Sequence, residues 1–468
     1  MALDFSVFLQ DPRFRAIVQD GVLERAFHDS LYPALMFRQE ADPQPFPGHV
    51  GDSMVFSAPG LMKTKQRPLK PGDDVQPSQY GYEQWRATVQ KYADAIDTDM
   101  PTNYVAIVDL LMRNMHQLGL GGAQTLNRIV RNRMYAAAES GWTVARGLQS
   151  SVTSLAVHRL NGFTTARRPD LAAGSQVAFA PVSATNPLPI TVNTTTGPAV
   201  VNVTGFTSVT AGDEVGPGTL TIDSAVSVAD RAYIQSSDAT SIVRVGGALQ
   251  VDGITSADIA SFAAIRTAVA RFRTQNVPAM PDRRFHCHMD PTWEAQLFAD
   301  DEMQRVNTAL PDYYIYKEFS AGEILGCLFV RNSECPLPET VTQDSSQTDS
   351  FSQDDPFAGE LYSNGLTGVK LHRGLFVGQS SIYEYYADLD ELISEAGVTG
   401  EVGYAKIVNN GIDVMADRIQ MIIRGPLDRL QEKVSSAYKF IGDWPVRTDA
   451  AVGDSARFKR LQLVISGE

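Results

Sequence analysis

The chain has few cysteines and no long apolar run, and both absences limit what it can be. Its 468 residues include three cysteines, Cys287, Cys327 and Cys335. Their odd number and irregular spacing make a disulfide framework unexpected. Mean hydropathy is −0.15, and no stretch approaches the ~18 consecutive apolar residues that a membrane-spanning helix needs. Residues 1–10, MALDFSVFLQ, carry an acid where a secretory signal carries positive charge. We therefore expect a protein without membrane contact that folds in the cytoplasm.

The sequence motifs of common enzyme classes are missing as well. The phosphate loop Gly-x4-Gly-Lys-Ser/Thr, the Gly-x-Ser-x-Gly of serine hydrolases, His-Glu-x-x-His and Cys-x-x-Cys do not occur. The glycines of residues 119–122 lack the spacing of a dinucleotide-binding loop. For a chain of this length, these absences count against catalysis. We predict no catalytic residue, no cofactor-binding residue and no metal ligand.

One pair of histidines keeps a metal-dependent activity open. His286 and His288 alternate along a predicted strand, so they share one face and could bind zinc. Apart from Asp290, no third ligand lies nearby in the sequence. The ordinary interpretation is a half-buried strand with two histidines, in which Cys287 points into the core. A metal-dependent hydrolase that uses His286 and His288 therefore stays an alternative.

Basic residues are too few for tight binding of nucleic acid. The chain has 40 Lys and Arg against 54 Asp and Glu, a net charge of −14, and no basic stripe is evident. Four bases gather in one segment and could contact phosphate: Lys63, Lys65, Arg67 and Lys70. Asp73 and Asp74 follow at once, which favours a solvated or intersubunit loop. This charge is compatible with a protein that encloses nucleic acid without holding it tightly.

What the chain does have is a long helical pattern over residues 104–139. Leu126, Val130 and Met134 recur at the three- and four-residue spacing of one helix face. Such an amphipathic helix needs a packing partner to be stable. The three glycines of residues 119–122 each lower helix stability by about 1 kcal/mol relative to alanine. We therefore predict a break there.

The segments around this helix differ in composition, and a chain of this length suggests about two to four packing units. Residues 1–47 form an apolar, proline-rich arm that packs either on another subunit or on its own domain. Residues 48–98 predict a long hairpin with strands at 52–57 and 85–96. Residues 170–253, poor in charge and rich in Thr, Val, Ala and Gly, predict a small antiparallel β unit with strands at 190–193, 200–204, 218–222 and 241–245.

The rest of the chain mixes helices and strands. A helix is predicted at residues 256–273, and a strand at 283–289 leads into a second helix. Asp290 is a good N-cap for that helix, and Pro291 suits its first position. Further strands are predicted at residues 323–331, 369–372, 418–424 and 457–465.

The order of these parts resembles the major capsid protein of tailed bacteriophages, which has the Hong Kong 97-like fold. Residues 284–297, RFHCHMDPTWEAQL, and 322–331, GEILGCLFVR, are similar to the family's axial-domain pattern. That pattern is a strand, a helix begun by proline, and a strand after a glycine-containing turn. Residues 375–385 and 457–465 resemble a later element and the closing strand of the family.

The resemblance covers roughly residues 45–468 and implies a fold of class α+β. Its implied parts are an N-terminal arm (1–47), an extended loop in the form of a β-hairpin (48–98), a peripheral domain with the spine helix (99–169), an inserted β-rich domain (170–253), an axial α/β domain (254–424) and a C-terminal segment that returns to the peripheral or axial domain (425–468).

The same resemblance implies a structural protein of the virion and not an enzyme. Copies would self-assemble as hexamers and pentamers into an icosahedral shell, the viral capsid, around double-stranded DNA. Implied partners are a portal protein, a separate scaffolding protein, a decoration protein as a further candidate, and packaged DNA through weak non-specific contact. Assembly would take place in the host cytoplasm. An encapsulin-like shell protein remains an alternative, although the chain length and the β-rich insertion favour the bacteriophage protein.

Overall fold

The computed structural model describes residues 36–46, 51, 53–59, 72, 74–75, 82–99, 110–167, 179–209, 216–237, 239–248, 253–308, 322–332, 334–336, 363–364, 369–387, 398–402, 405–408, 411–416, 418–424, 432–451 and 455–468. These residues form both helices and sheets, which confirms the mixed α and β class. Most of the predicted arm, and the segment that contains Lys63, Lys65, Arg67 and Lys70, lie outside the described residues.

The chain divides into two compact units, and each is assembled from separate stretches. One unit takes Met1–Val55, Arg86–Arg131 and Ile382–Pro445, and the other takes Phe56–Trp85, Asn132–Ser381 and Val446–Glu468. The domain boundaries implied by the resemblance stay predictions. Among the described residues, no helix is long and apolar enough to cross a membrane.

The first unit is built on an eight-stranded sheet. Its order is β1 (Asp42–Phe46), β19 (Tyr383–Ala387), β24 (Lys433–Asp443), β23 (Ile419–Arg424), β22 (Gly411–Ala416), β21 (Ala405–Val408) and β20 (Val398–Val402), and β4 (Gln90–Asp99) also pairs with β24. The β4–β24 ladder is antiparallel and joins Gln90 to Gly442 at one end and Asp99 to Lys433 at the other. Strand β23 confirms the strand predicted at 418–424.

The end of the arm packs on its own unit. Phe37 is fully buried, and its backbone N–H donates to Asn127 Oδ1 at 2.9 Å. Arg38 forms a buried ion pair with Glu384, with 2.6 Å between Nη2 and Oε1. Strand β1 then runs parallel to β19 at the edge of the sheet, the position where its prolines are tolerated. Of the two predicted packing partners of the arm, another subunit or its own domain, these residues pack on their own domain.

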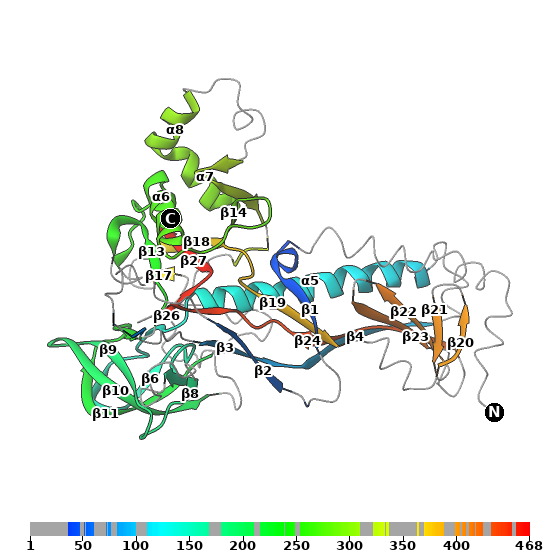
Figure 1. The fold of residues 1–468 in the computed structure, drawn as a ribbon, viewed down its shortest axis with the longest axis horizontal. Helices are drawn as coiled ribbons and strands as arrows, with labels where there is room; N and C mark the ends of the chain where they lie inside the picture. Colours follow the sequence, from blue (N-terminus) through cyan, green and yellow to red (C-terminus); the bar gives the residue numbers. More distant parts are fainter. Residues whose placement is uncertain are drawn as a thin grey trace. The chain divides into compact units, whose positions relative to one another are not determined.

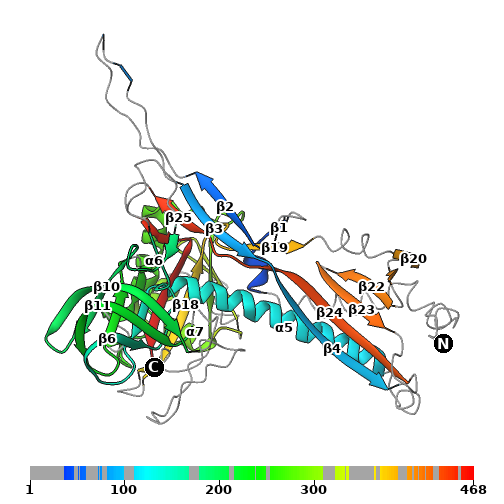
Figure 2. The same cartoon turned by 90° about the horizontal axis from the view of Figure 1, so that it is seen from below.

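The long helix α5 (Leu110–Ala138) has no break at its glycines, so that prediction was wrong. A Cβ on Gly122 would lie 3.2 Å from the ring of Tyr438 on β24. The missing side chain thus lets helix and strand approach closely, and packing outweighs the weak helix propensity. Leu126, Val130 and Met134 are fully buried, which confirms the predicted stripe. Figures 1 and 2 show α5 running beside β4 and β24.

The hairpin predicted from residues 48–98 forms only in part. β2 (Ser53–Pro59) and β3 (Tyr82–Thr88) make a two-stranded sheet. The predicted return strand 85–96 is divided at Val89, because β4 leaves the hairpin and joins the eight-stranded sheet.

The second unit contains a six-stranded antiparallel sheet with a buried core that is mainly aliphatic. Its order is β5 (Trp142–Val144), β12 (Tyr233–Ser236), β9 (Leu188–Thr194), β10 (Gly197–Ser208), β11 (Gly218–Val228) and β6 (Gln149–Val157). The short pair β7 (Thr165–Arg167) and β8 (Phe179–Pro181) accompanies it. The predicted β unit is therefore present, and two strands from before residue 170 complete it.

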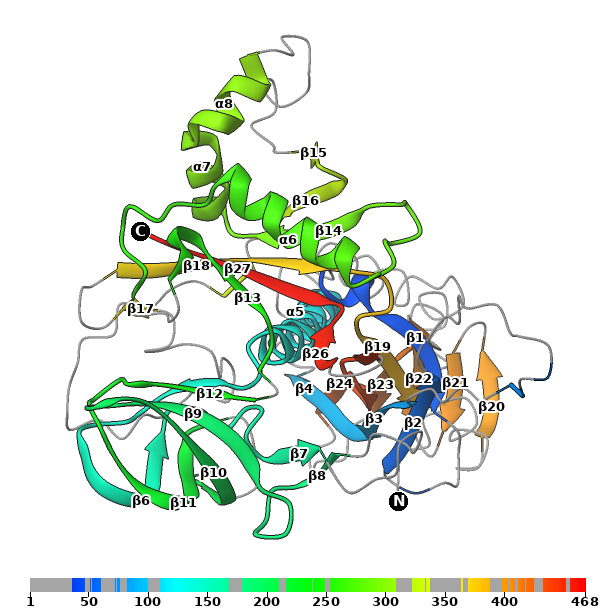
Figure 3. The ribbon, with the colours of Figure 1, turned by 60° about the vertical axis from the view of Figure 1, so that its left-hand side comes forward.

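The same unit contains a seven-stranded sheet with helices packed on it. Its order is β13 (Ile242–Arg244), β27 (Leu461–Gly467), β18 (Val369–Val377), β14 (Phe285–Met289), β16 (Cys327–Arg331) and β15 (Glu323–Ile324), and β17 (Ser363–Asn364) pairs with β18. Helices α6 (Phe262–Thr274) and α7 (Pro291–Ala299) lie beside this sheet, as Figure 3 shows. They bury Ile265, Phe272 and Trp293 in one hydrophobic core with residues of its strands. Helix α8 (Asp301–Thr308) follows α7. The strand predicted at 241–245 belongs here, since β13 pairs with β27.

Three further predictions about this unit need correction. Helix α6 begins at Phe262 and not at residue 256, because Asp258 accepts hydrogen bonds from the N–H and hydroxyl of Thr255 in a preceding turn. The strand predicted at 323–331 is a tight hairpin, since Leu325 and Gly326 take positive φ. The strand predicted at 457–465 is divided between β26 (Ser455–Lys459), which pairs with β25 (Thr448–Ala451), and β27.

Candidate functional site

The histidine pair on β14 does not form a metal site with the residues that the structure describes. His286 places Nε2 3.0 Å from Asp282 Oδ2, and His288 is buried. Cys287 lies between them in the core, as the strand pattern predicts. No group of three His, Cys, Asp or Glu side chains in the described part of the chain could hold a metal ion. The geometry therefore does not favour the metal-dependent hydrolase.

One buried cluster places a carboxylate between two arginines. Glu139 follows the last residue of α5, and its two oxygens accept from Arg159 Nη1 at 2.5 Å and Arg373 Nη1 at 2.6 Å. Burial alone would raise the pKa of Glu139, but the two guanidinium groups outweigh it and lower the pKa. We call these three residues the Glu139 cluster. It ties the end of α5 to β18 and to the chain just after β6.

A second cluster has the opposite composition, with a histidine between two carboxylates. His372 Nδ1 lies 2.7 Å from Asp290 Oδ2, and its Nε2 lies 2.9 Å from Glu468 Oε2. Burial opposes the charged imidazolium, but the hydrogen bonds and charges of Asp290 and Glu468 outweigh it and raise the pKa of His372. Asp290 also accepts from the Trp293 N–H as the N-cap of α7. We call this set the His372 cluster.

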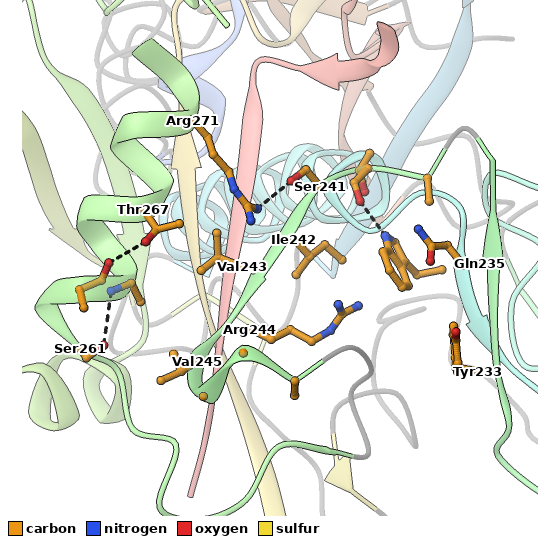
Figure 4. Close-up of a pocket in the computed structure, with 18 residues that line it drawn as sticks. Tyr233, Gln235, Ser241, Ile242, Val243, Arg244, Val245, Ser261, Thr267 and Arg271 are labelled. Carbon is orange, nitrogen blue, oxygen red and sulfur yellow. Dashed lines mark hydrogen bonds between the residues drawn. The ribbon is translucent and has the colours of Figure 1, made fainter. Parts of the chain in front are cut away.

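A hollow of about 780 Å³ lies beside the edge strand β13, and we call it the β13 pocket. Its walls come from β5, β12, β13 and α6, as Figure 4 shows, and its larger side chains are Trp142, Tyr233, Ile242, Arg244 and Arg271. The described residues that line it include two arginines and no Asp, Glu, Lys, His or Cys.

The two arginines of the β13 pocket each contact a neighbouring side chain of its wall. The guanidinium carbon of Arg244 lies 4.2 Å from the centre of the Trp142 ring, a cation–π contact. Arg271 Nη1 donates to Ser241 Oγ at 2.7 Å. Burial lowers the pKa of Arg244 to about 10, against an opposing effect of Glu139. A pocket of this kind attracts anions, and its described walls bring no nucleophile together with a base.

Sequence reasoning missed both clusters and the pocket. Arg231 and Arg244 are the only basic residues between positions 170 and 253. Two arginines in a segment so poor in charge were a signal that could have marked this region. No such signal exists for Glu139 or His372, whose partners come from distant parts of the chain.

Comparison with known proteins finds likeness at the level of structure alone. No family model and no curated protein matches the chain. The capsid of Ralstonia phage GP4 matches with 12% identity over 91% of this chain and 86% of that chain, at a TM-score of 0.48. The cyanophage Pam1 capsid matches with 9% identity over 94% and 92%, also at 0.48. The mature capsid of bacteriophage PhiM1 matches with 8% identity over 92% and 86%, at 0.45.

All three are phage capsids, the class of protein that the sequence resembles. Because their TM-scores lie below 0.5, these likenesses by themselves assign no function to the chain.

Proposed function

We propose that the protein is the major capsid protein of a tailed double-stranded DNA bacteriophage, with a Hong Kong 97-like fold. Its copies would assemble into the icosahedral head shell. One observation carries the proposal: β2 and β3 form a two-stranded sheet that joins none of the larger sheets of the described chain. The long helix α5 follows this hairpin, and the strand–Asp-Pro–helix unit of β14 and α7 comes later. This is the order of parts that the resemblance implies.

An isolated hairpin is unstable in water, and this one carries apolar surface. Two-stranded sheets need a further strand or a packed face for stability. Val55 on β2 is 58% exposed and Val75, in the connecting segment, is 62% exposed. Phe56 and Trp85 stack across the hairpin with 6.3 Å between ring centres. Such a hairpin gains stability by lying on another chain, which supports its role as the extended loop of residues 48–98.

The other parts take their roles from the same proposal. Helix α5 would be the spine helix of the peripheral domain, and α6, α7 and the seven-stranded sheet would form most of the axial domain. The six-stranded sheet would be the insertion. Hexamers and pentamers of the chain are the expected capsomers, with portal, scaffolding and decoration proteins as further partners.

The charge of the chain supports weak contact with packaged DNA. With a net charge of −14, a shell made of many copies repels phosphates over most of its surface and releases few counterions on contact. We further propose that the protein is structural and not an enzyme, that it is located in the virion, and that it assembles in the host cytoplasm.

The test is assembly of the purified protein, with and without removal of the hairpin tip. We expect closed shells tens of nanometres wide in negative-stain micrographs. Replacing residues 60–81 by a short glycine linker should leave the circular dichroism spectrum unchanged and abolish the shells. Removal of residues 210–215, which connect β10 to β11 along the chain, serves as the control deletion elsewhere. A wild-type chain that stays monomeric under all assembly conditions, or a tip deletion that forms shells as well as the control, would contradict the proposal.

A further inference from the structure

We propose that the β13 pocket is a docking site for an acidic segment of a second copy of this chain. The inference rests on the proposed function, because it assumes that copies associate, and it names a surface through which they do so. The pocket lies entirely within the second unit.

The residue types in the pocket are those that dominate binding between proteins. Trp, Tyr and Arg supply most of the binding energy at such interfaces. Here Trp142, Tyr233, Arg244 and Arg271 stand around the half-buried Ile242 in one hollow. Figure 4 shows Arg271 reaching toward β13 from α6 and Arg244 reaching away from β13. The guanidinium of Arg244 lies over the Trp142 ring. An apolar centre with cations on both flanks suits a partner that has acidic side chains beside an apolar one.

Both guanidinium groups are positioned before any partner arrives. Arg244 stacks on Trp142, and Arg271 bonds to Ser241. A guanidinium has five N–H donors, and the Ser241 hydroxyl takes one of those of Arg271. A carboxylate can accept two of the remaining donors in parallel. Burial lowers the pKa of Arg271 because it removes water from the charged guanidinium. A carboxylate bound there would offset this desolvation cost of Arg271.

The edge of β13 offers a backbone surface next to these side chains. β13 is the end strand of the seven-stranded sheet in the described chain, where it pairs with β27. All three residues of β13 line the pocket. An end strand can pair with an extended segment from another chain. The side chains of Ile242 and Arg244, two residues apart, would then contact alternate residues of the added segment.

A second copy fits this site better than DNA does. Each copy has 54 acids and a net charge of −14, so another copy brings the charge that two arginines attract. A hollow of about 780 Å³ is the size of a site that encloses a small ligand or a few side chains. The convex backbone of duplex DNA is too broad to enter it.

The first experiment compares Arg271→Glu with Arg266→Glu. Both positions lie on α6 and both substitutions change the chain's charge equally, but Arg266 lies outside the β13 pocket. Arg266 has one exposed ion pair, with Glu302 at 3.8 Å, so its loss changes stability little. We expect Arg271→Glu to weaken self-association at least tenfold in sedimentation velocity and Arg266→Glu to resemble wild type. Arg271→Lys should recover part of the loss. Equal behaviour of the two charge reversals would overturn the docking site.

The second experiment measures burial of the pocket directly. Ala263 is an exposed residue of the pocket wall, and the three native cysteines are buried. In Ala263→Cys the new thiol therefore reacts with maleimide. We expect its reaction to slow at least tenfold when copies associate. An unchanged rate would overturn the inference. Protection that disappears after nuclease treatment would do the same, because it would identify nucleic acid as the occupant.

These outcomes separate the docking site from the proposed function. Normal shells from Arg271→Glu, together with a reactive Cys at position 263, would exclude the site and leave the capsid assignment intact. Association into small oligomers without shells, in which position 263 is protected, would support the site and contradict the capsid assignment. A chain that never associates would contradict both.

Discussion

The Glu139 cluster and the His372 cluster lie on the two faces of one strand, and they have opposite ratios of acidic to basic side chains. Glu139 sits between Arg159 and Arg373, whereas His372 sits between two carboxylates. His372 and Arg373 are consecutive residues of β18, so their side chains point to opposite faces of the sheet. One strand therefore anchors a cluster on each side.

The difference between the clusters lies in how permanent their charges are. Arginine stays protonated near neutral pH, and the pKa of Glu139 is lowered, so the charges of the Glu139 cluster persist there. The imidazole of His372 loses its proton within the range that a solution experiment can reach. The first cluster should act as a fixed tie between α5 and β18. The second should hold α7 and the end of β27 more tightly at low pH than at high pH.

The largest expected effect comes from Glu139→Gln. The substitution keeps the side-chain shape but leaves Arg159 and Arg373 buried without their shared carboxylate. Breaking a buried ion pair in this way costs about 3–5 kcal/mol. Calorimetry of the unassembled chain should show a large fall in the melting temperature of one transition, equally at pH 6 and pH 9. A loss below about 1 kcal/mol would mean that the cluster is not a fixed tie between α5 and β18.

A smaller and pH-dependent effect is expected for His372→Gln. The folded-state pKa of His372 is raised above the ordinary value of 6.5. The ion pairs therefore contribute in full below pH 6.5, and their contribution is lost as the pH rises through the folded-state pKa. We expect a loss of about 2 kcal/mol at pH 6, since hydrogen bonds to charged groups contribute at this level. Glu468 is 49% exposed, so water screens its charge and Asp290 supplies most of the stabilisation that is lost.

The measurement is the free energy of unfolding of wild type and variant at several pH values. Subtracting the free energy of the variant from that of wild type cancels the contributions of the other titrating groups. The difference should shrink from pH 6 to pH 9. A difference that stays constant would show that His372 is buried neutral, and the contrast between the two clusters would disappear.

Asp290→Asn separates the two roles of that residue. Asparagine caps helices about as well as aspartate, so the bond to the Trp293 N–H should survive. Only the charge facing His372 is lost, and we expect a cost of about 1–2 kcal/mol at pH 6. The cost should be smaller at pH 9, where less of His372 is protonated than at pH 6. An equal loss of stability at pH 6 and pH 9 would mean that the whole loss comes from the N-cap of α7.

Local rules predict the elements of this chain better than the contacts between them. The cap and proline at Asp290 and Pro291 begin α7 as predicted, and period-two alternation places Cys287 in the core. Each of these depends on neighbours within a few residues. The predicted break in α5 failed because Tyr438, a residue far along the chain, packs on Gly122. Strand β24 was missed, although Val434, Tyr438 and Phe440 are buried at alternating positions.

The clusters could not be predicted, because their members are distant in sequence. Arg373 is 234 residues from Glu139, and Asp290 and Glu468 are 82 and 96 residues from His372. No spacing rule joins such residues. A lone histidine or glutamate in a strand-rich segment is more often an ordinary surface or core residue. Only the fold reveals which charges meet.

The smallest expected effect comes from Glu302→Gln, which tests whether burial, and not the ion pair itself, sets the size of these effects. Glu302 pairs with Arg266 at 3.8 Å, but the two side chains are 48% and 63% exposed. Water screens such a pair, and holding two long side chains costs entropy, so we expect a change below about 0.5 kcal/mol. Calorimetry of this variant beside Glu139→Gln supplies the measurement. A loss near 2 kcal/mol would show that exposed pairs matter here, and the large effect at Glu139 could then not be assigned to its burial.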